Sequence, residues 1–177
     1  MCGEPVGPQH RQSRVPLGDD VKLALITGLV ACIAGLTMMA AAEAADTFFM
    51  GSWKLSGAVV APWADPGQKP DGAEPSRLLG QIIVFKAKQI TGPPPFACKA
   101  PHYKESDFTA DMIFQGAFEE MQSKNKSVDP NRMAASLGFV GNRIKTLETG
   151  CDINFHFVDA TTAEIGLNDR VYTLKKQ

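Results

Sequence analysis

Residues 151–174, CDINFHFVDATTAEIGLNDRVYTL, decide the fold class of this chain. From Cys151 to Val158 apolar and polar residues alternate, which is typical of a β-strand with one buried face. Two further β-rich runs, 163–167 and 170–174, are separated only by Asn168-Asp169, a pair that favours a tight hairpin turn. The stretch therefore predicts successive strands joined by short connections.

The same kind of pattern occurs upstream. Residues 52–60 carry Trp53 on an apolar face, and the runs 81–90 and 143–148 are β-rich. Residues 107–121 fit either a loose helical period or a strand, and their Met-Ile-Phe run favours a strand. We therefore expect a mainly β protein (β-rich α+β), built as an antiparallel barrel or a curled sheet.

One short helix is expected near residues 130–137. Asp129 is a favourable N-cap, Pro130 suits the first helical turn, and Gly138 follows the last turn. In contrast, residues 61–76 contain four prolines and two glycines, which suit neither a helix nor a central strand. This segment is expected to be a long surface loop.

The N-terminal part predicts export. Residues 21–44 consist of Lys22, an apolar core and the small-residue sequence Ala42-Glu43-Ala44, which is the pattern of a signal peptide cleaved after Ala44. Cleavage there would leave residues 45–177 as a single β-rich domain in the periplasm or outside the cell.

Three further points concern this N-terminal part. Residues 1–20 do not fit a signal peptide, and we interpret them as an extension from a misassigned gene start. Retention of the apolar run as a membrane anchor is one alternative to cleavage. A lipoprotein acylated at Cys32 is another, because residues 29–32 match a loose lipobox.

Charge and composition make several functions unexpected. From residue 45 onward, basic and acidic residues are equal in number, and there is neither a basic patch nor a long run of one charge. Nucleic acid is therefore not an expected partner. There is also no Gly-x-Ser-x-Gly motif or other catalytic constellation, so neither an enzymatic activity nor a cofactor is expected.

Cys98 and Cys151 are the two cysteines that follow the predicted leader. In an oxidising compartment they are expected to form one disulfide. A zinc site completed by His102 and His156 is the alternative. A regular strand would point Cys151 and His156 to opposite faces, which favours the disulfide.

Gly51-x-Trp53, at the start of the first expected strand and followed by a long loop, resembles the opening of the lipocalins and the wider calycin group. The resemblance implies a barrel in which Trp53 closes one end and a basic residue of the last strand packs across it. Arg170 is the candidate for that basic residue. The loop 61–76, with Trp63, would be a lid over a ligand cavity.

Two functional expectations follow. The first is an exported protein that binds a small apolar or amphipathic ligand in the barrel mouth, with Trp63, Trp53 and Arg170 as ligand-binding residues. The alternative is a periplasmic module that binds or inhibits another exported protein through the Pro-rich loop. As a whole, the chain resembles the small exported proteins of Gram-negative bacteria.

Overall fold

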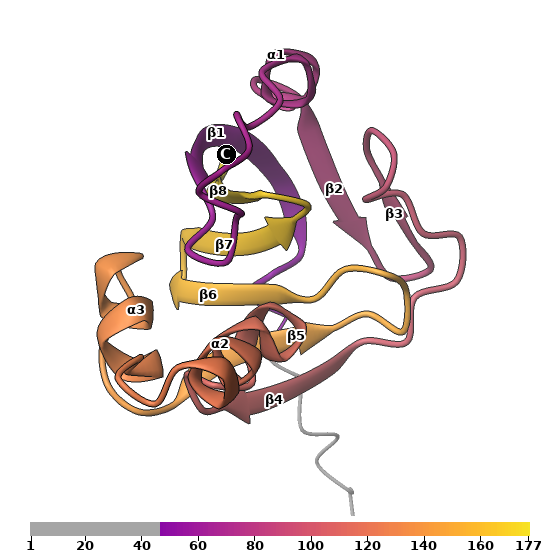
Figure 1. Cartoon of the computed structure of the whole chain (residues 1–177). Helices are drawn as coiled ribbons and strands as arrows, with labels where there is room; N and C mark the ends of the chain where they lie inside the picture. The colour runs from indigo at the N-terminus through magenta and orange to yellow at the C-terminus, as the bar shows by residue number, and fades with distance from the viewer. Residues whose placement is uncertain (1–46) are drawn as a thin grey trace, which may run out of the picture. The chain divides into compact units, whose positions relative to one another are not determined.

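The computed structural model describes residues 47–177, so the predicted leader, the preceding extension and Cys32 lie outside the described residues. Within this part of the chain, eight strands form one antiparallel sheet in the spatial order β3-β2-β1-β8-β7-β6-β5-β4 (Figure 1). The strands are β1 Gly51–Val60, β2 Ile82–Lys86, β3 Gln89–Thr91, β4 Lys104–Phe108, β5 Ile144–Glu148, β6 Phe155–Asp159, β7 Thr162–Leu167 and β8 Arg170–Lys176.

The sheet is curled into a half-barrel, with β3 and β4 as its two edges (Figure 1). The register shifts between Leu55 and Gly57 in β1, and between Phe157 and Asp159 in β6. Such irregularities bend a strand and increase its twist, which favours a curled sheet. The expected mainly β fold is confirmed, in its curled-sheet form.

The predicted hairpin is confirmed. Leu167 of β7 pairs with Arg170 of β8, so the turn consists of Asn168 and Asp169. Asn168 has a φ of 49°, a left-handed conformation that asparagine tolerates and that tight hairpin turns require.

Three helices accompany the sheet: α1 Ala73–Leu78, α2 Ile113–Lys124 and α3 Pro130–Ser136. Helix α3 is the predicted one, and the Asp129 side chain caps it by accepting hydrogen bonds from the backbone N–H groups of Asn131 and Arg132. The expectation that residues 61–76 contain no helix is wrong at their end, where α1 begins. Pro75 lies in the first turn of α1, where its missing N–H costs nothing.

The strand expected at the Met-Ile-Phe run is also wrong. Ile113 and Phe114 begin α2, and both side chains are buried. Phe114, Gln115 and Gly116 have φ values of 52°, 57° and 78°, so the first turn of α2 is left-handed. A run of apolar residues fits a strand or a buried turn equally well, and here packing against the sheet decides.

Three other strands differ from the prediction. The strand expected from Cys151 begins only at Phe155, because the chain bends at residues 150–152. Residues 81–90 form a hairpin of β2 and β3, not one strand, because the chain turns at Ala87-Lys88 while the alternation continues through the turn. Strand β4 is not predicted, since its sequence Lys-Glu-Ser-Asp-Phe is polar, as suits an edge strand.

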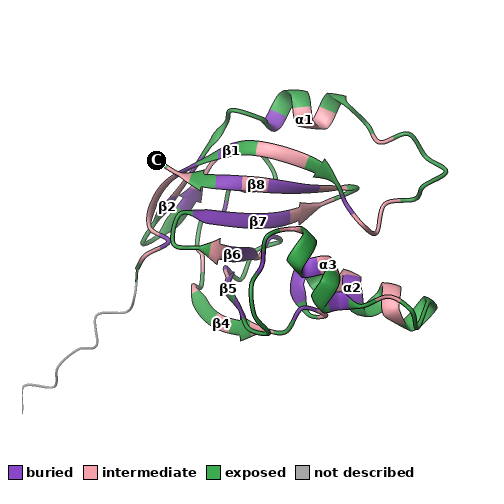
Figure 2. Ribbon diagram, turned by 90° about the vertical axis from the view of Figure 1, so that its left-hand side faces the viewer, coloured by how far each residue is buried: buried purple, intermediate pink, exposed green. Residues whose placement is uncertain are grey.

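The two faces of the sheet support two hydrophobic clusters. Phe155 and Phe157 of β6 belong to the first, together with Trp53 of β1. The alternate residue Val158 packs against the second, which contains residues of α2 and α3 such as Phe118 and Ala134. Figure 2 shows the buried stretches along the central strands and the two helices beside one part of the sheet.

Candidate ligand-binding site

Trp53 lies in the core. Its side chain is fully buried, and its Nε1–H donates to the carbonyl oxygen of Phe49 at 2.7 Å. Its ring meets the rings of Phe85 and Phe157 in edge-to-face contacts. Because the indole has no exposed surface, its role in this structure is to stabilise the sheet.

The basic residue across Trp53 is Lys176, and the assignment of Arg170 to that place is wrong. Lys176 Nζ lies 5.7 Å from the centroid of the Trp53 ring. The pairing of β1 with β8 places Lys176 opposite Trp53 and Arg170 opposite Val60. These two positions on β1 are about 20 Å apart at the usual rise per strand residue. The sequence supplies basic residues at both ends of β8, and only the register distinguishes them.

Arg170 lies instead in a polar pocket of about 480 Å³, whose other lining residues are Asp71, Glu74, Asn168 and Asp169. Its guanidinium donates to the Asp71 carbonyl oxygen at 3.1 Å. The Glu74 carboxylate accepts from Asn168 Nδ2 at 2.5 Å and from the Tyr172 hydroxyl at 2.7 Å. These bonds attach the end of the long loop and α1 to the β7–β8 hairpin.

Trp63 packs back onto the protein. Its Nε1–H donates to the Asn168 carbonyl oxygen at 2.9 Å, and its ring lies 5.2 Å from that of Phe114 and 5.9 Å from that of Phe118, centroid to centroid. A Cβ at Gly166 would approach the Trp63 ring to 3.2 Å, so glycine makes this close contact possible. Trp63 therefore covers the second cluster, and the loop does not present it as a free aromatic anchor.

An apolar cleft of about 340 Å³ lies away from that loop, where β5 and β6 part. The pairing of these strands begins at Lys145 and Phe157, and the register shift of β6 against β7 follows immediately. The opening is lined by Phe48, Phe139, Val140, Arg143, Ile144, Lys145, Phe157, Val158, Asp159 and Ala160. None of these residues belongs to the loop 61–76, so the apolar cleft is not the cavity that the lid prediction described.

The lip of the cleft is shaped by two glycines. Gly138 and Gly141 have φ values of +95° and +88°, a conformation that side chains other than glycine rarely adopt. The sharp turns at these positions bury Phe139 to 4% exposure and leave the next residue, Val140, 89% exposed. Val140 therefore adds exposed apolar surface to the rim of the cleft.

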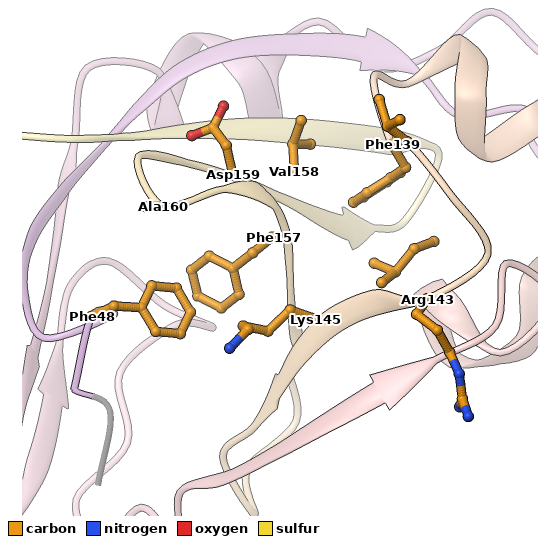
Figure 3. Close-up of a pocket in the computed structure, with 10 residues that line it drawn as sticks. Phe48, Phe139, Arg143, Lys145, Phe157, Val158, Asp159 and Ala160 are labelled. Atoms are coloured by element: carbon orange, nitrogen blue, oxygen red, sulfur yellow. The ribbon is translucent and has the colours of Figure 1, made fainter. Parts of the chain in front are cut away.

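Lys145 brings a positive charge to the cleft. Figure 3 shows its amino group next to the rings of Phe48 and Phe157, whereas the Arg143 side chain points away from them. Lys145 Nζ lies 5.1 Å from the centroid of the Phe48 ring and 3.4 Å from Glu105 Oε2. The arrangement combines aromatic walls with one half-exposed cation.

Asp159 is the acidic residue in the lining, and its carboxylate is held by its own turn. Oδ1 accepts from the backbone N–H and from the hydroxyl of Thr161, both at 2.7 Å. These hydrogen bonds lower the pKa of Asp159 and stabilise the turn between β6 and β7.

A polar row crosses the sheet from β5 to β8. The register aligns Thr146 of β5, His156 of β6, Glu164 of β7 and Thr173 of β8. His156 is fully buried; its Nε2 accepts from the Phe114 N–H at 2.9 Å, and its Nδ1 lies 2.9 Å from Thr146 Oγ1. Since Thr146 donates to the Ile144 carbonyl oxygen, these contacts fit a neutral ring with its proton on Nδ1. Burial lowers the pKa of His156 to about 3.

Glu164 is the buried carboxyl of this row. Its two oxygens lie 3.0 and 3.1 Å from the Thr173 hydroxyl. Burial raises the pKa of Glu164 to about 7, against the opposing effects of the Thr173 hydrogen bond and the Lys175 charge. His156 and Glu164 hold the left-handed start of α2 and the adjoining strands, and neither lines the apolar cleft.

Cys98 and Cys151 are bonded, as expected, with an S–S distance of 1.99 Å. Cys98 also pairs with Ile90 of β3 through a β-bridge, while Cys151 lies between β5 and β6. The disulfide therefore links the β3 side of the half-barrel to its β5–β6 side. Among residues 47–177, no group of three or more His, Cys, Asp or Glu side chains is arranged to hold a metal ion, and no helix is long and apolar enough to cross a membrane.

The fold and the cleft define a class: a curled antiparallel half-barrel with an apolar, cation-bearing cleft at its rim. Comparison of the chain with family models, curated proteins and solved structures gives no match. The residues of the cleft are not among the predicted site residues. The signal that could have indicated them is the apolar pair Phe139-Val140 between two glycines, directly before a strand.

Proposed function

We propose that the protein is an exported, lipocalin-like binding protein for a small apolar or amphipathic ligand, and that the ligand occupies the cleft lined by Phe48, Phe139, Phe157 and Val158. The observation that carries the proposal is the cleft itself. Its volume of about 340 Å³ falls within the range of small-molecule sites, which are mostly apolar with a few polar groups.

The rest of the structure supports a binding role at this rim. The part of the first cluster around Trp53 is filled by its own apolar side chains, with Trp53, Leu55, Ile83 and Leu174 fully buried. The cleft, in contrast, is open on the side of the exposed Val140. The Cys98–Cys151 disulfide agrees with an oxidising compartment, as export requires.

Binding is tested by titrating Nile red, an uncharged apolar dye, and following its fluorescence. Val140→Asp places a carboxylate at the apolar lip and is expected to weaken binding about fivefold or more. Val59→Asp is the matched control, because Val59 is also exposed (51%) but lies on β1 outside the cleft. Absence of saturable binding, or equal weakening by both substitutions, would contradict the proposed site.

Export is tested separately on the protein from its natural host. Mass spectrometry is expected to find an N-terminus at Ala45 or Asp46, as cleavage after Ala44 requires. A mature chain beginning with an acylated Cys32 would instead place the protein on a membrane surface.

A further inference from the structure

We propose that the ligand of this cleft is an amphipathic carboxylate of medium chain length, and that Lys145 binds its head group by exchanging Glu105 for the carboxylate of the ligand. This inference rests on the proposed function, since it specifies the chemistry of the same site.

The position of Lys145 is the first argument. Its side chain lines the apolar cleft and also a small polar pocket of about 170 Å³ that it shares with Glu105, Ser106 and Asp107. The ammonium group therefore lies at the border between an apolar space and a polar one. An amphipathic molecule has the same division, with a tail for one space and a charged head for the other.

The charges around the cleft favour an anion. Arg143 and Lys145 are the cations of the lining, and Asp159, its acid, is engaged by Thr161. Arg143 donates to the Asp107 carbonyl oxygen at 3.4 Å and points away from the aromatic rings (Figure 3). Lys145 is consequently the cation that a head group next to Phe48 and Phe157 would meet.

Glu105, the ion-pair partner of Lys145, shows that this ammonium group binds a carboxylate. Glu105 Oε2 lies 3.4 Å from Lys145 Nζ, and the two side chains are 29% and 47% exposed. The neighbouring pair on the same two strands, Lys104 and Glu148, is tighter at 2.9 Å. A long, half-exposed ion pair contributes little free energy, so a ligand carboxylate can replace Glu105 at small cost.

The lining and the volume of the cleft determine which apolar tail a ligand can have. Phe139, Phe157 and Val158 supply apolar side chains to the lining, and the volume of the cleft is near the lower limit for small-molecule sites. An alkyl chain of medium length is therefore the matching tail.

The experiment compares two competitors that differ only in the head group. Decanoate and decanol each displace Nile red from the intact protein at about pH 8, where the carboxylate is ionised. Wild type is expected to bind decanoate about fivefold more tightly than decanol, which is the scale of one half-exposed ion pair. Lys145→Gln is expected to abolish this preference, so that the variant binds decanoate no more tightly than decanol.

Two further variants make the test specific. Glu105→Gln removes the competing carboxylate and is expected to strengthen decanoate binding about twofold to fivefold. Lys104→Gln is the matched control, because it removes a cation from the adjacent ion pair outside the cleft lining and is expected to change neither affinity.

The outcomes separate this inference from the proposed function. If both competitors displace the dye equally from wild type, or if Lys145→Gln retains the preference for decanoate, the head-group assignment is wrong while the apolar site stands. If Nile red does not bind the wild-type protein, the proposed function fails first, and the carboxylate inference fails with it.

Discussion

Acid should destabilise this protein through His156. The buried ring is neutral in the folded state, with its pKa lowered from 6.5 to about 3, whereas in the unfolded chain it regains its usual pKa. Between these two values the unfolded state binds more protons than the folded state, so stability falls as the pH falls through the window. Protonation also removes the Nε2 lone pair that accepts the Phe114 N–H.

The magnitude follows from the width of the window. Each pH unit between the two pKa values changes the free energy of unfolding by about 1.4 kcal/mol, so the whole interval amounts to about 4 to 5 kcal/mol. That loss is comparable to the total stability of many small domains. The loss would weaken the left-handed turn at Phe114, Gln115 and Gly116, whose backbone conformation is costly for its two non-glycine residues.

The assay is urea unfolding of wild type and His156→Gln from about pH 3 to about pH 8. Glutamine keeps an acceptor for the Phe114 N–H but does not titrate. The carboxyl groups of Asp and Glu titrate in both proteins, so the difference between the unfolding free energies of the two proteins isolates the effect of His156. It is expected to shift steadily in favour of the variant as the pH falls below about 6.5. Parallel stability curves over the whole range would refute the reasoning.

Three other changes test separate parts of the structure by urea unfolding. Trp63→Ala should destabilise the protein by about 2 kcal/mol or more, because the ring covers the second cluster; an unchanged midpoint would mean that the loop is not packed. Cys98→Ser should cost about 2 to 5 kcal/mol, and two titratable thiols in native wild type would contradict the disulfide. Glu164, with its pKa raised to about 7, holds its proton in the folded state above the pH at which the unfolded chain loses it. The contribution of Glu164 to stability should therefore fall as the pH rises from about 4.5 to about 7, opposite in sign to that of His156. The difference between Glu164→Gln and wild type isolates it and should shift in favour of the variant by about 3 kcal/mol over this range; a difference that does not change with pH would be evidence against a buried carboxyl.

Sequence patterns predicted the elements that are stabilised by residues close to them in the sequence. The β7–β8 hairpin follows from Asn168-Asp169 between two apolar runs, and α3 follows from Asp129 and Pro130. In both cases neighbouring residues supply the hydrogen bonds or the backbone conformation that the element needs.

The start of α2 could not be predicted in the same way. In its left-handed conformation, Phe114 donates its N–H to His156, which lies 42 residues later in the sequence. No pattern around residues 112–116 contains this information, and the apolar run by itself suggested a strand.

The candidate site shows the same limit. Arg170 and Lys176 are both basic residues of β8, and the β1–β8 register alone decides which of them meets Trp53. The cleft likewise depends on where β5 and β6 separate, a tertiary feature that alternation does not encode. Trp63 looked free because its loop has no core pattern, but its partners Phe114 and Phe118 come from α2.

The most direct test of the proposed function is a titration with decanoate followed by the backbone amide resonances of the protein. If the ligand occupies the cleft, the largest shifts should fall on Phe48, Phe139, Val140, Lys145 and Phe157 and should saturate together. Largest shifts in the loop 61–76 and at Arg170 would contradict the account and return the binding site to the Pro-rich loop. No saturable shift at all would contradict a ligand-binding function for this cleft.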